Sequence, residues 1–294
     1  MQIYSVNPAN GEQIKAYTAH SDEHISTKIT QTHIAWLNWK LTGFDERSKL
    51  LTNMANVLKQ RKQELAKLMA MEMGKPLLQG ISEVEKCAAV CEYYAANAAN
   101  YLKDQLVETE ATKSYICFQP IGVVLAIMPW NFPFWQVFRF LAPALAAGNG
   151  GVLKHASNVP GCALVIEEIV KQAGFPANVF QTLLAGSKQV DKIIENKYIM
   201  AVTITGSTSA GQKVAQKAGS LLKKTVLELG GSDAYIILED ADLDKVAEMC
   251  VNSRIINSGQ SCIAAKRFIV VKSVAKQFTD LFHQKMAARK WANR

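Results

Sequence analysis

The stretch Ile121-Gly122-Val123-Val124-Leu125-Ala126-Ile127-Met128-Pro129-Trp130-Asn131 decides how this sequence is expected to fold. From Ile121 to Met128 it is almost continuously apolar, which is typical of a strand buried on both faces of a sheet. A proline then ends the run, and an asparagine follows. Because ligands of open α/β sheets bind beyond the carboxyl ends of the strands, this turn is expected to face a cofactor or a substrate.

On both sides of this stretch, apolar runs alternate with helical patterns. The expected strands are residues 122–127, 149–154, 179–182, 201–204, 225–229, 234–238 and 267–271. The expected helices are residues 134–147, 159–173, 187–196, 208–219, 242–257 and 273–287. Such alternation predicts the α/β class, with a Rossmann-like parallel sheet and flanking helices.

Three longer amphipathic stretches precede the alternation and are expected to be helices. They cover residues 22–40, 45–73 and 80–104. The second stretch ends at Gly74-Lys75-Pro76, a glycine followed by a proline, which is a typical helix stop. In the third, Cys87 and Cys91 are one turn apart and are expected on its buried face. The six cysteines of the chain show neither a disulfide framework nor the spacing of a zinc site, so no metal is expected.

The composition argues against two classes of partner. The net charge is +8, from 33 Lys and Arg against 25 Asp and Glu, but the lysines are scattered and no nucleic-acid motif is present. Residues 114–138 carry no charge, yet their prolines and Asn131 argue against one continuous membrane helix. Residues 1–4 do not begin a signal peptide. We therefore expect no nucleic acid, no membrane and a cytoplasmic location.

Three turn-rich motifs carry the groups needed for covalent catalysis at a carbonyl. They are Pro129-Trp130-Asn131-Phe132-Pro133, Leu227-Glu228-Leu229-Gly230-Gly231 and Ser258-Gly259-Gln260-Ser261-Cys262. Asn131 offers an amide donor, Glu228 a carboxylate base and Cys262 a thiol nucleophile. Each also has an ordinary interpretation: a turn asparagine, a solvated carboxylate at a strand end, and a cysteine that fills a core.

In their order and spacing, these motifs resemble the aldehyde dehydrogenase superfamily, and within it the succinate-semialdehyde dehydrogenase branch, over about residues 3–285. The resemblance implies that Cys262 attacks an aldehyde. Asn131 and the Cys262 backbone N–H would stabilise the oxyanion, and Glu228 would activate the water that hydrolyses the thioester.

The resemblance also implies a division of the chain into domains. Residues 1–104 and 120–228 would form a dinucleotide-binding domain. Residues 105–119 would form an oligomerisation hairpin, and residues 229–294 would begin a catalytic domain. Family members are homo-oligomers.

The cofactor implied by the resemblance is NADP or NAD. The residues that would bind it are Trp130, Lys154, Ser157, Gly206, Ser207 and Leu229. Many relatives have glutamate where this chain has Ser157, and such a carboxylate would repel a 2′-phosphate, so NADP should be accepted. Lys154 would bind the adenosine ribose or its phosphate, or it is a solvated loop lysine. Gly206 and Ser207 would bind the pyrophosphate, and Ser207 or Thr208 would cap the helix; the two roles are compatible. His155 is expected to be an exposed loop residue.

Arg139 points to the substrate class. In the family, an arginine at this position accompanies semialdehyde substrates, whose carboxylate matches the guanidinium fork. The alternative is a surface arginine that interacts with the helix dipole. A second arginine expected in some members is replaced by Ile256, and Arg254 lies two residues earlier. Succinate semialdehyde is the expected substrate.

The sequence departs from the family after Met286. The resemblance calls for well over a hundred further residues there, including a strand for subunit contact, so we expect an incomplete catalytic domain in a truncated chain. Two hypotheses follow: an oxidoreductase, or an inactive fragment that at most binds a dinucleotide. The resemblance favours the first as the ancestral function and the second for this chain.

Overall fold

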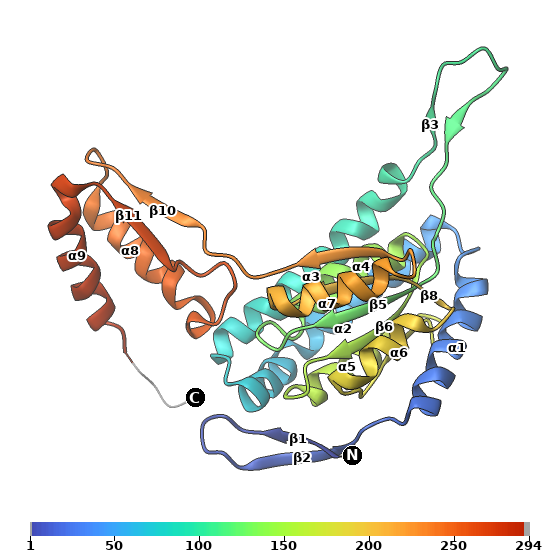
Figure 1. Ribbon diagram of the computed structural model, residues 1–294, viewed down its shortest axis with the longest axis horizontal. Coiled ribbons are helices and arrows are strands. Elements are labelled where there is room, and N and C mark those ends of the chain that lie inside the picture. The colour runs from blue at the N-terminus through green and yellow to red at the C-terminus, as the bar shows by residue number, and fades with distance from the viewer. Residues whose placement is uncertain (1, 291–294) are drawn as a thin grey trace. The chain divides into compact units, whose positions relative to one another are not determined.

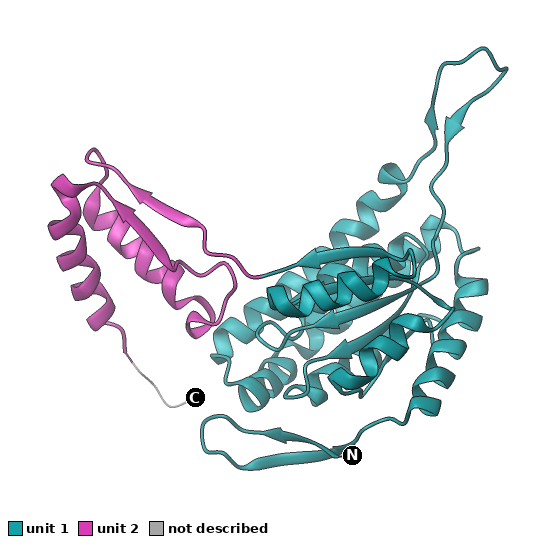
Figure 2. Cartoon of the chain, viewed as in Figure 1, with its two compact units in different colours: residues 1–229 teal, residues 230–294 magenta. Residues whose placement is uncertain are grey.

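The computed structural model describes residues 2–290. The chain divides after Leu229 into two compact units (Figures 1 and 2). Each unit has its own hydrophobic core.

The first unit is built on a five-stranded parallel sheet (Figure 1). Its strands, in spatial order, are β7 (Phe180–Thr182), β6 (Gly150–His155), β5 (Val123–Met128), β8 (Ile199–Thr205) and β9 (Lys224–Glu228). The register pairs Met128 with His155 and Thr205 with Glu228, so the carboxyl ends of neighbouring strands lie together. The predicted parallel α/β sheet is confirmed.

Helices cover both faces of this sheet. They are α1 (Asp22–Trp39), α2 (Phe44–Met73), α3 (Leu77–Tyr101), α4 (Trp135–Ala146), α5 (Pro160–Gln172), α6 (Val190–Glu195) and α7 (Thr208–Gly219). In β5, Ala126 packs into a cluster with residues of α2, α3, α4 and α5, whereas its neighbour Leu125 packs with α1, α6 and α7. Because successive strand residues point to opposite faces, this alternation buries the sheet on both sides and explains the continuous apolar run.

Two predictions about the long helices are confirmed. Gly74 ends α2 in the left-handed conformation, with φ 71°, and its N–H donates to the Ala70 carbonyl. Glycine is suited to this position because it has no Cβ to strain the left-handed backbone. Cys87 and Cys91 are both fully buried on α3.

Two antiparallel hairpins complete the first unit. One pairs β1 (Gln2–Val6) with β2 (Gln13–Thr18). The other pairs β3 (Gln105–Leu106) with β4 (Tyr115–Ile116) and projects from the rest of the unit (Figure 1). Apolar side chains on this second hairpin, including Leu106, are exposed. Its role in oligomerisation stays a prediction.

The second unit is small. Its strands β10 (Ala234–Ile237) and β11 (Arg267–Val270) are parallel, and α8 (Leu243–Ile255) and α9 (Lys272–Ala287) accompany them. Ile237, Ala247 and Phe278 lie in its core.

Two helix expectations need correction. Residues 187–196 form a short 3-10 turn, η1 (Ser187–Gln189), followed by α6. The Gln189 side chain accepts a hydrogen bond from the Gly186 N–H, which favours a tight turn there. The helix expected to reach residue 257 ends at Ile255, because Asn257 and Ser258 have positive φ angles that no α-helix contains.

The uncharged segment is not one helix. Residues 114–138 divide among β4, β5, a turn and the start of α4. Within residues 2–290, no helix has both the length and the apolar character of a membrane span.

Candidate active site

Asn131 lies in the turn between β5 and α4. It is half-buried, and its backbone carbonyl accepts a hydrogen bond of 2.9 Å from the Lys75 ammonium. The neighbouring Trp130 is exposed, beyond the carboxyl end of β5. The turn therefore has the position that the sequence predicted, at the edge of the sheet where ligands bind.

Arg139 and Glu228 lie together at the same edge. The Arg139 guanidinium on α4 has its Nη1 3.5 Å from Glu228 Oε2 and donates from Nη2 to Thr205 Oγ1 at 3.2 Å. Thr205 ends β8 and Glu228 ends β9, and the two are register partners. Arg139 thus contacts side chains at two strand ends. A surface arginine that interacts only with the helix dipole would not make these contacts.

A cavity of about 480 Å³ lies next to this pair, between α4 and strands β5, β8 and β9. Its walls are mostly apolar and include Val124, Met128, Phe140 and Val226. Arg139, Thr205 and Glu228 also line it. An apolar cavity with a few converging polar groups is the usual form of a small-molecule site.

Gly206, Ser207 and Leu229 meet at the start of α7. The Gly206 N–H donates to the Glu228 carbonyl at 3.0 Å, and Ser207 Oγ accepts from the Ala210 N–H, which confirms the predicted N-cap. Leu229 packs against Gly211, where an added Cβ would lie only 2.4 Å from Leu229 Cδ2. Since the amino end of a helix attracts anions, this turn fits a pyrophosphate.

Lys154 is a half-buried residue of β6, so the interpretation as a solvated loop lysine is wrong. Burial lowers the pKa of its ammonium. Among residues 2–290, no carboxylate forms an ion pair with it. Ser157 is exposed in the turn that follows β6. A partly desolvated cation without a protein counter-ion, close in sequence to a hydroxyl, fits a phosphate group of a dinucleotide.

The expectation that His155 is exposed was wrong. The side chain is buried at the end of β6, where Nε2 is 2.9 Å from the Pro133 carbonyl and Nδ1 accepts from the Ala156 N–H. Burial lowers its pKa to about 4, so the ring is neutral at physiological pH. A carbonyl only accepts hydrogen bonds, which places the proton on Nε2.

Cys262 belongs to the second unit and its side chain is exposed, so the interpretation as a core filler is wrong. Arg254 binds the loop backbone before and after Cys262: it donates to the Gly259 carbonyl at 2.8 Å and to the Ala265 carbonyl at 2.9 Å. Lys266 donates to the Cys262 carbonyl at 2.8 Å. The Cys262 thiol therefore lies on a loop whose backbone carbonyls are bound by Arg254 and Lys266.

The residues just before Cys262 have a sparsely populated backbone conformation. Asn257, Ser258 and Gly259 all have positive φ, of 52°, 55° and 79°. A left-handed backbone is costly at the non-glycine residues Asn257 and Ser258, and such residues cluster at functional sites. Within residues 2–290, no group of three His, Cys, Asp or Glu side chains is arranged to hold a metal.

Comparison with known proteins identifies the family. The model of the aldehyde dehydrogenase family matches residues 1–294. The chain belongs to the aldehyde dehydrogenase family.

Its relatives within that family share both sequence and fold. It is 52% identical over 278 residues to the probable succinate-semialdehyde dehydrogenase (NADP+) of Synechocystis sp., covering 95% of this chain and 61% of that protein. It is 45% identical over 291 residues to succinate-semialdehyde dehydrogenase (NADP+) 1 of Mycobacterium bovis, covering 98% and 64%.

A solved structure gives the same likeness. Succinic semialdehyde dehydrogenase from Streptococcus pyogenes, in complex with NADP+, matches with a TM-score of 0.95 and 36% identity, covering 98% of this chain and 64% of that one. The chain thus spans less than two thirds of the length of these relatives.

The sequence does not indicate four residues that support the predicted turn and loop. It shows Lys75 only as part of a helix stop, His155 only as an exposed residue and Arg254 only as a displaced substrate arginine. Glu83 of α3, whose carboxylate accepts hydrogen bonds from the Phe134 and Trp135 N–H groups, has no sequence signal. A charged residue between the glycine and the proline of a helix stop is a signal, but its partners are far away in the sequence.

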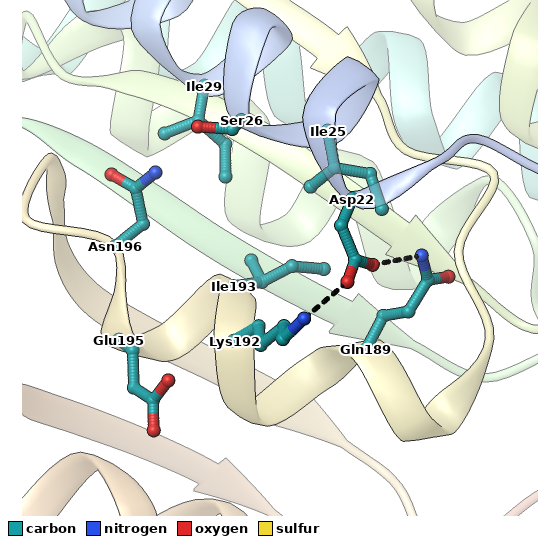
Figure 3. Close-up of a pocket in the computed structure, with 9 residues that line it drawn as sticks. All are labelled: Asp22, Ile25, Ser26, Ile29, Gln189, Lys192, Ile193, Glu195 and Asn196. Carbon is teal, nitrogen blue, oxygen red and sulfur yellow. Dashed lines mark hydrogen bonds and ion pairs between the residues drawn. The ribbon is translucent and has the colours of Figure 1, made fainter.

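A second cavity, of about 300 Å³, lies between α1 and α6 (Figure 3). Lys192 and Gln189 both contact the Asp22 carboxylate, at 2.6 and 2.8 Å, and these two contacts lower the pKa of Asp22. None of the predicted site residues lines this cavity. It is therefore separate from the candidate active site.

Proposed function

We propose that this protein oxidises an aldehyde that carries a carboxylate, succinate semialdehyde, to the dicarboxylic acid with NADP+. The observation that carries the proposal is Arg139, a cation on the wall of an apolar cavity that also contains Glu228. A guanidinium there supplies the charge that a substrate carboxylate needs in an otherwise apolar space. The names of the relatives support the same substrate.

The proposed reaction uses the side chains of Cys262, Asn131 and Glu228. The Cys262 thiolate would attack the aldehyde carbon, while the Asn131 amide and the Cys262 backbone N–H donate to the oxygen that becomes negative. The chemistry that NADP+ would supply when bound is acceptance of the hydride from the substrate carbon. Glu228 would then remove a proton from water, which hydrolyses the Cys262 thioester and releases succinate. Each turnover consumes one aldehyde, one water and one NADP+.

A bound substrate carboxylate would also change the Arg139–Glu228 ion pair. One guanidinium fork favours one carboxylate at a time in a bidentate arrangement. A substrate carboxylate would therefore compete with Glu228 for Arg139. When the substrate binds Arg139, Glu228 would be released and could act as a base. Neutral aldehydes would lack this effect.

NADP is the proposed cofactor because Lys154 and Ser157 suit a 2′-phosphate. Lys154 supplies positive charge, and Ser157 supplies a hydroxyl where a carboxylate would repel the phosphate. Gly206 and Ser207 would bind the pyrophosphate at the start of α7.

A second candidate is a dinucleotide-binding module without turnover. The observation that favours it is that Lys154, Ser157, Gly206 and Ser207 all lie in the first unit, whereas Cys262 belongs to the second. The two candidates differ in a simple assay: purified protein is mixed with NADP+ and either succinate semialdehyde or butanal, and NADPH absorbance is followed.

The proposed enzyme gives NADPH with succinate semialdehyde, and Cys262→Ala abolishes it. NADP binding measured by calorimetry, without NADPH formation, would support the binding module and reject the enzyme. Turnover that survives in the Cys262→Ala variant would reject the mechanism.

A further inference from the structure

Lys75 contacts the Asn131 turn from a fully buried position. Its side chain has no exposed surface, although it carries an ammonium group. Three neighbours surround that group: the Glu83 carboxylate, the Asn131 carbonyl at 2.9 Å, and the Phe132 ring, whose centroid is 3.8 Å away. A buried ammonium is tolerated only when it is paired in this way.

Glu83 holds the other end of the same turn. It is 2% exposed on α3, and one carboxylate oxygen bonds Lys75. The other oxygen accepts hydrogen bonds from the backbone N–H groups of Phe134 and Trp135, both at 2.9 Å. These amides are at the start of α4, which has no side-chain cap of its own. Glu83 thus provides the cap from another helix, where a negative charge also matches the helix dipole.

His155 provides a third attachment, from β6. Its Nε2–H donates to the Pro133 carbonyl, in the middle of the turn. The carbonyl between them, that of Phe132, accepts a hydrogen bond from the Gln136 N–H in the first turn of α4. Every carbonyl from residue 131 to residue 133 therefore has a partner.

We propose that Lys75, Glu83 and His155 are positioning residues, a buried cradle that fixes the backbone of residues 131–135 and, through it, the Asn131 amide at the reaction centre. The inference rests on the proposed function, since Asn131 is catalytic only if the protein oxidises aldehydes. All four hydrogen bonds reach backbone atoms, so the cradle acts on the path of the chain. A donor must be held to within about half an ångström to stabilise an oxyanion.

The structure contains a control pair close to this one, formed between α2 and α3. Lys62 of α2 and Glu85 of α3 also form an ion pair, at 2.6 Å, but both side chains are exposed and neither contacts the turn. The test compares Lys75→Met/Glu83→Met with Lys62→Met/Glu85→Met in the 294-residue chain. Both members of each pair are replaced together, so that neither variant is left with an isolated buried charge.

Hydrogen exchange reads the backbone directly. In Lys75→Met/Glu83→Met, the Phe134 and Trp135 amides should exchange at least about tenfold faster, while amides inside β5 keep their protection. The control pair should leave all of them unchanged. Unchanged exchange at residues 134 and 135 would overturn the cradle.

Kinetics then separate positioning from general support. The cradle variant should lose about a hundredfold in kcat while KM for the aldehyde and Kd for NADP stay near their original values. His155→Ala should lower kcat as well, and His155→Gln, which keeps an N–H donor, should restore most of it. Faster exchange with an unchanged kcat would overturn the positioning role.

A double-mutant cycle with Asn131 completes the test. If the cradle acts through Asn131, adding its two substitutions to Asn131→Ala should cause little further loss in kcat. Losses that multiply would overturn the inference. If the unmodified chain shows no turnover, the proposed function fails, and the cradle is then judged by hydrogen exchange alone.

Discussion

The Arg139 guanidinium lies 3.5 Å from the Glu228 carboxylate, so the residue that would bind the substrate and the residue that would activate water are in contact. Both side chains are partly exposed, at 36% and 53%, and the ion pair is therefore weak. Because the ion pair is weak, a substrate carboxylate can replace Glu228 at Arg139 at little cost. The arrangement links recognition of the substrate to the release of the base.

The first prediction tests that link. Arg139→Met removes the charge but keeps an extended apolar side chain, so KM for succinate semialdehyde should rise at least about tenfold while KM for butanal changes little. Steady-state kinetics with both aldehydes measures this. Lys171→Met, on the exposed side of α5, serves as the control for loss of one positive charge. Equal effects on the two aldehydes would show that Arg139 does not read the carboxylate.

The second prediction concerns the cofactor. Ser157→Glu places a carboxylate near the position proposed for the 2′-phosphate, and NADP affinity should fall about tenfold or more while NAD affinity is kept. Calorimetric titration of both cofactors is the measurement. Ser220→Glu, at the far end of α7, adds the same charge away from β6. NADP affinity that is unaffected by Ser157→Glu would remove Ser157 from the cofactor site.

The third prediction follows from the lowered pKa of His155. Its pKa of about 4 lies below the ordinary value of 6.5, so the folded protein binds fewer protons than the unfolded chain between these pH values. The contribution of neutral, buried His155 to the free energy of unfolding is complete above pH 6.5 and is lost as the pH falls toward 4. Between pH 7 and pH 5 the loss is about 2 kcal/mol.

Urea unfolding at pH 7 and pH 5 checks this value. His155→Gln should lose about 2 kcal/mol less stability over this interval than the unmodified protein does. His283→Gln, an exposed histidine of α9, should lose as much as the unmodified protein. The same pH dependence in all three proteins would contradict a buried, neutral His155.

The fourth prediction ranks the cysteines. Cys262 and Cys117 are exposed, whereas the other four are buried, and burial raises the pKa of the Cys87, Cys91, Cys162 and Cys250 thiols. Because only the thiolate reacts, Cys262 should be alkylated well before the buried four, and before Cys117 if its loop is adapted for catalysis. Competitive alkylation with peptide mapping gives the order. Labelling of Cys162 or Cys250 as early as Cys262 would contradict an accessible nucleophile.

Much of the fold could be predicted because its signals are local. The strand expected at residues 122–127 is Val123–Met128, and the helix expected at residues 208–219 has those bounds in the structure. Both depend on apolar periodicity and on turn residues within a few positions. The expected cap at Ser207 is also local, since its partner is Ala210.

The supporting residues of the site could not be predicted because their partners are distant. Lys75 contacts the Asn131 carbonyl 56 positions later, and Glu83 contacts amides 51 and 52 positions later. Nothing in the spacing of the residues indicates that these charges are buried. The prediction for His155 was wrong for the same reason: its partner, Pro133, lies in the turn that follows the neighbouring strand β5, 22 positions earlier.

The central claim is that Cys262 carries the substrate as a thioester and that Glu228 is needed to hydrolyse it. The most direct measurement is the intact mass of the Glu228→Gln chain after incubation with succinate semialdehyde and NADP+, followed by peptide mapping. We predict a succinyl adduct of about 100 Da on Cys262, formed together with one NADPH per chain. NADPH formed without an adduct, or an adduct on another cysteine, would contradict the account.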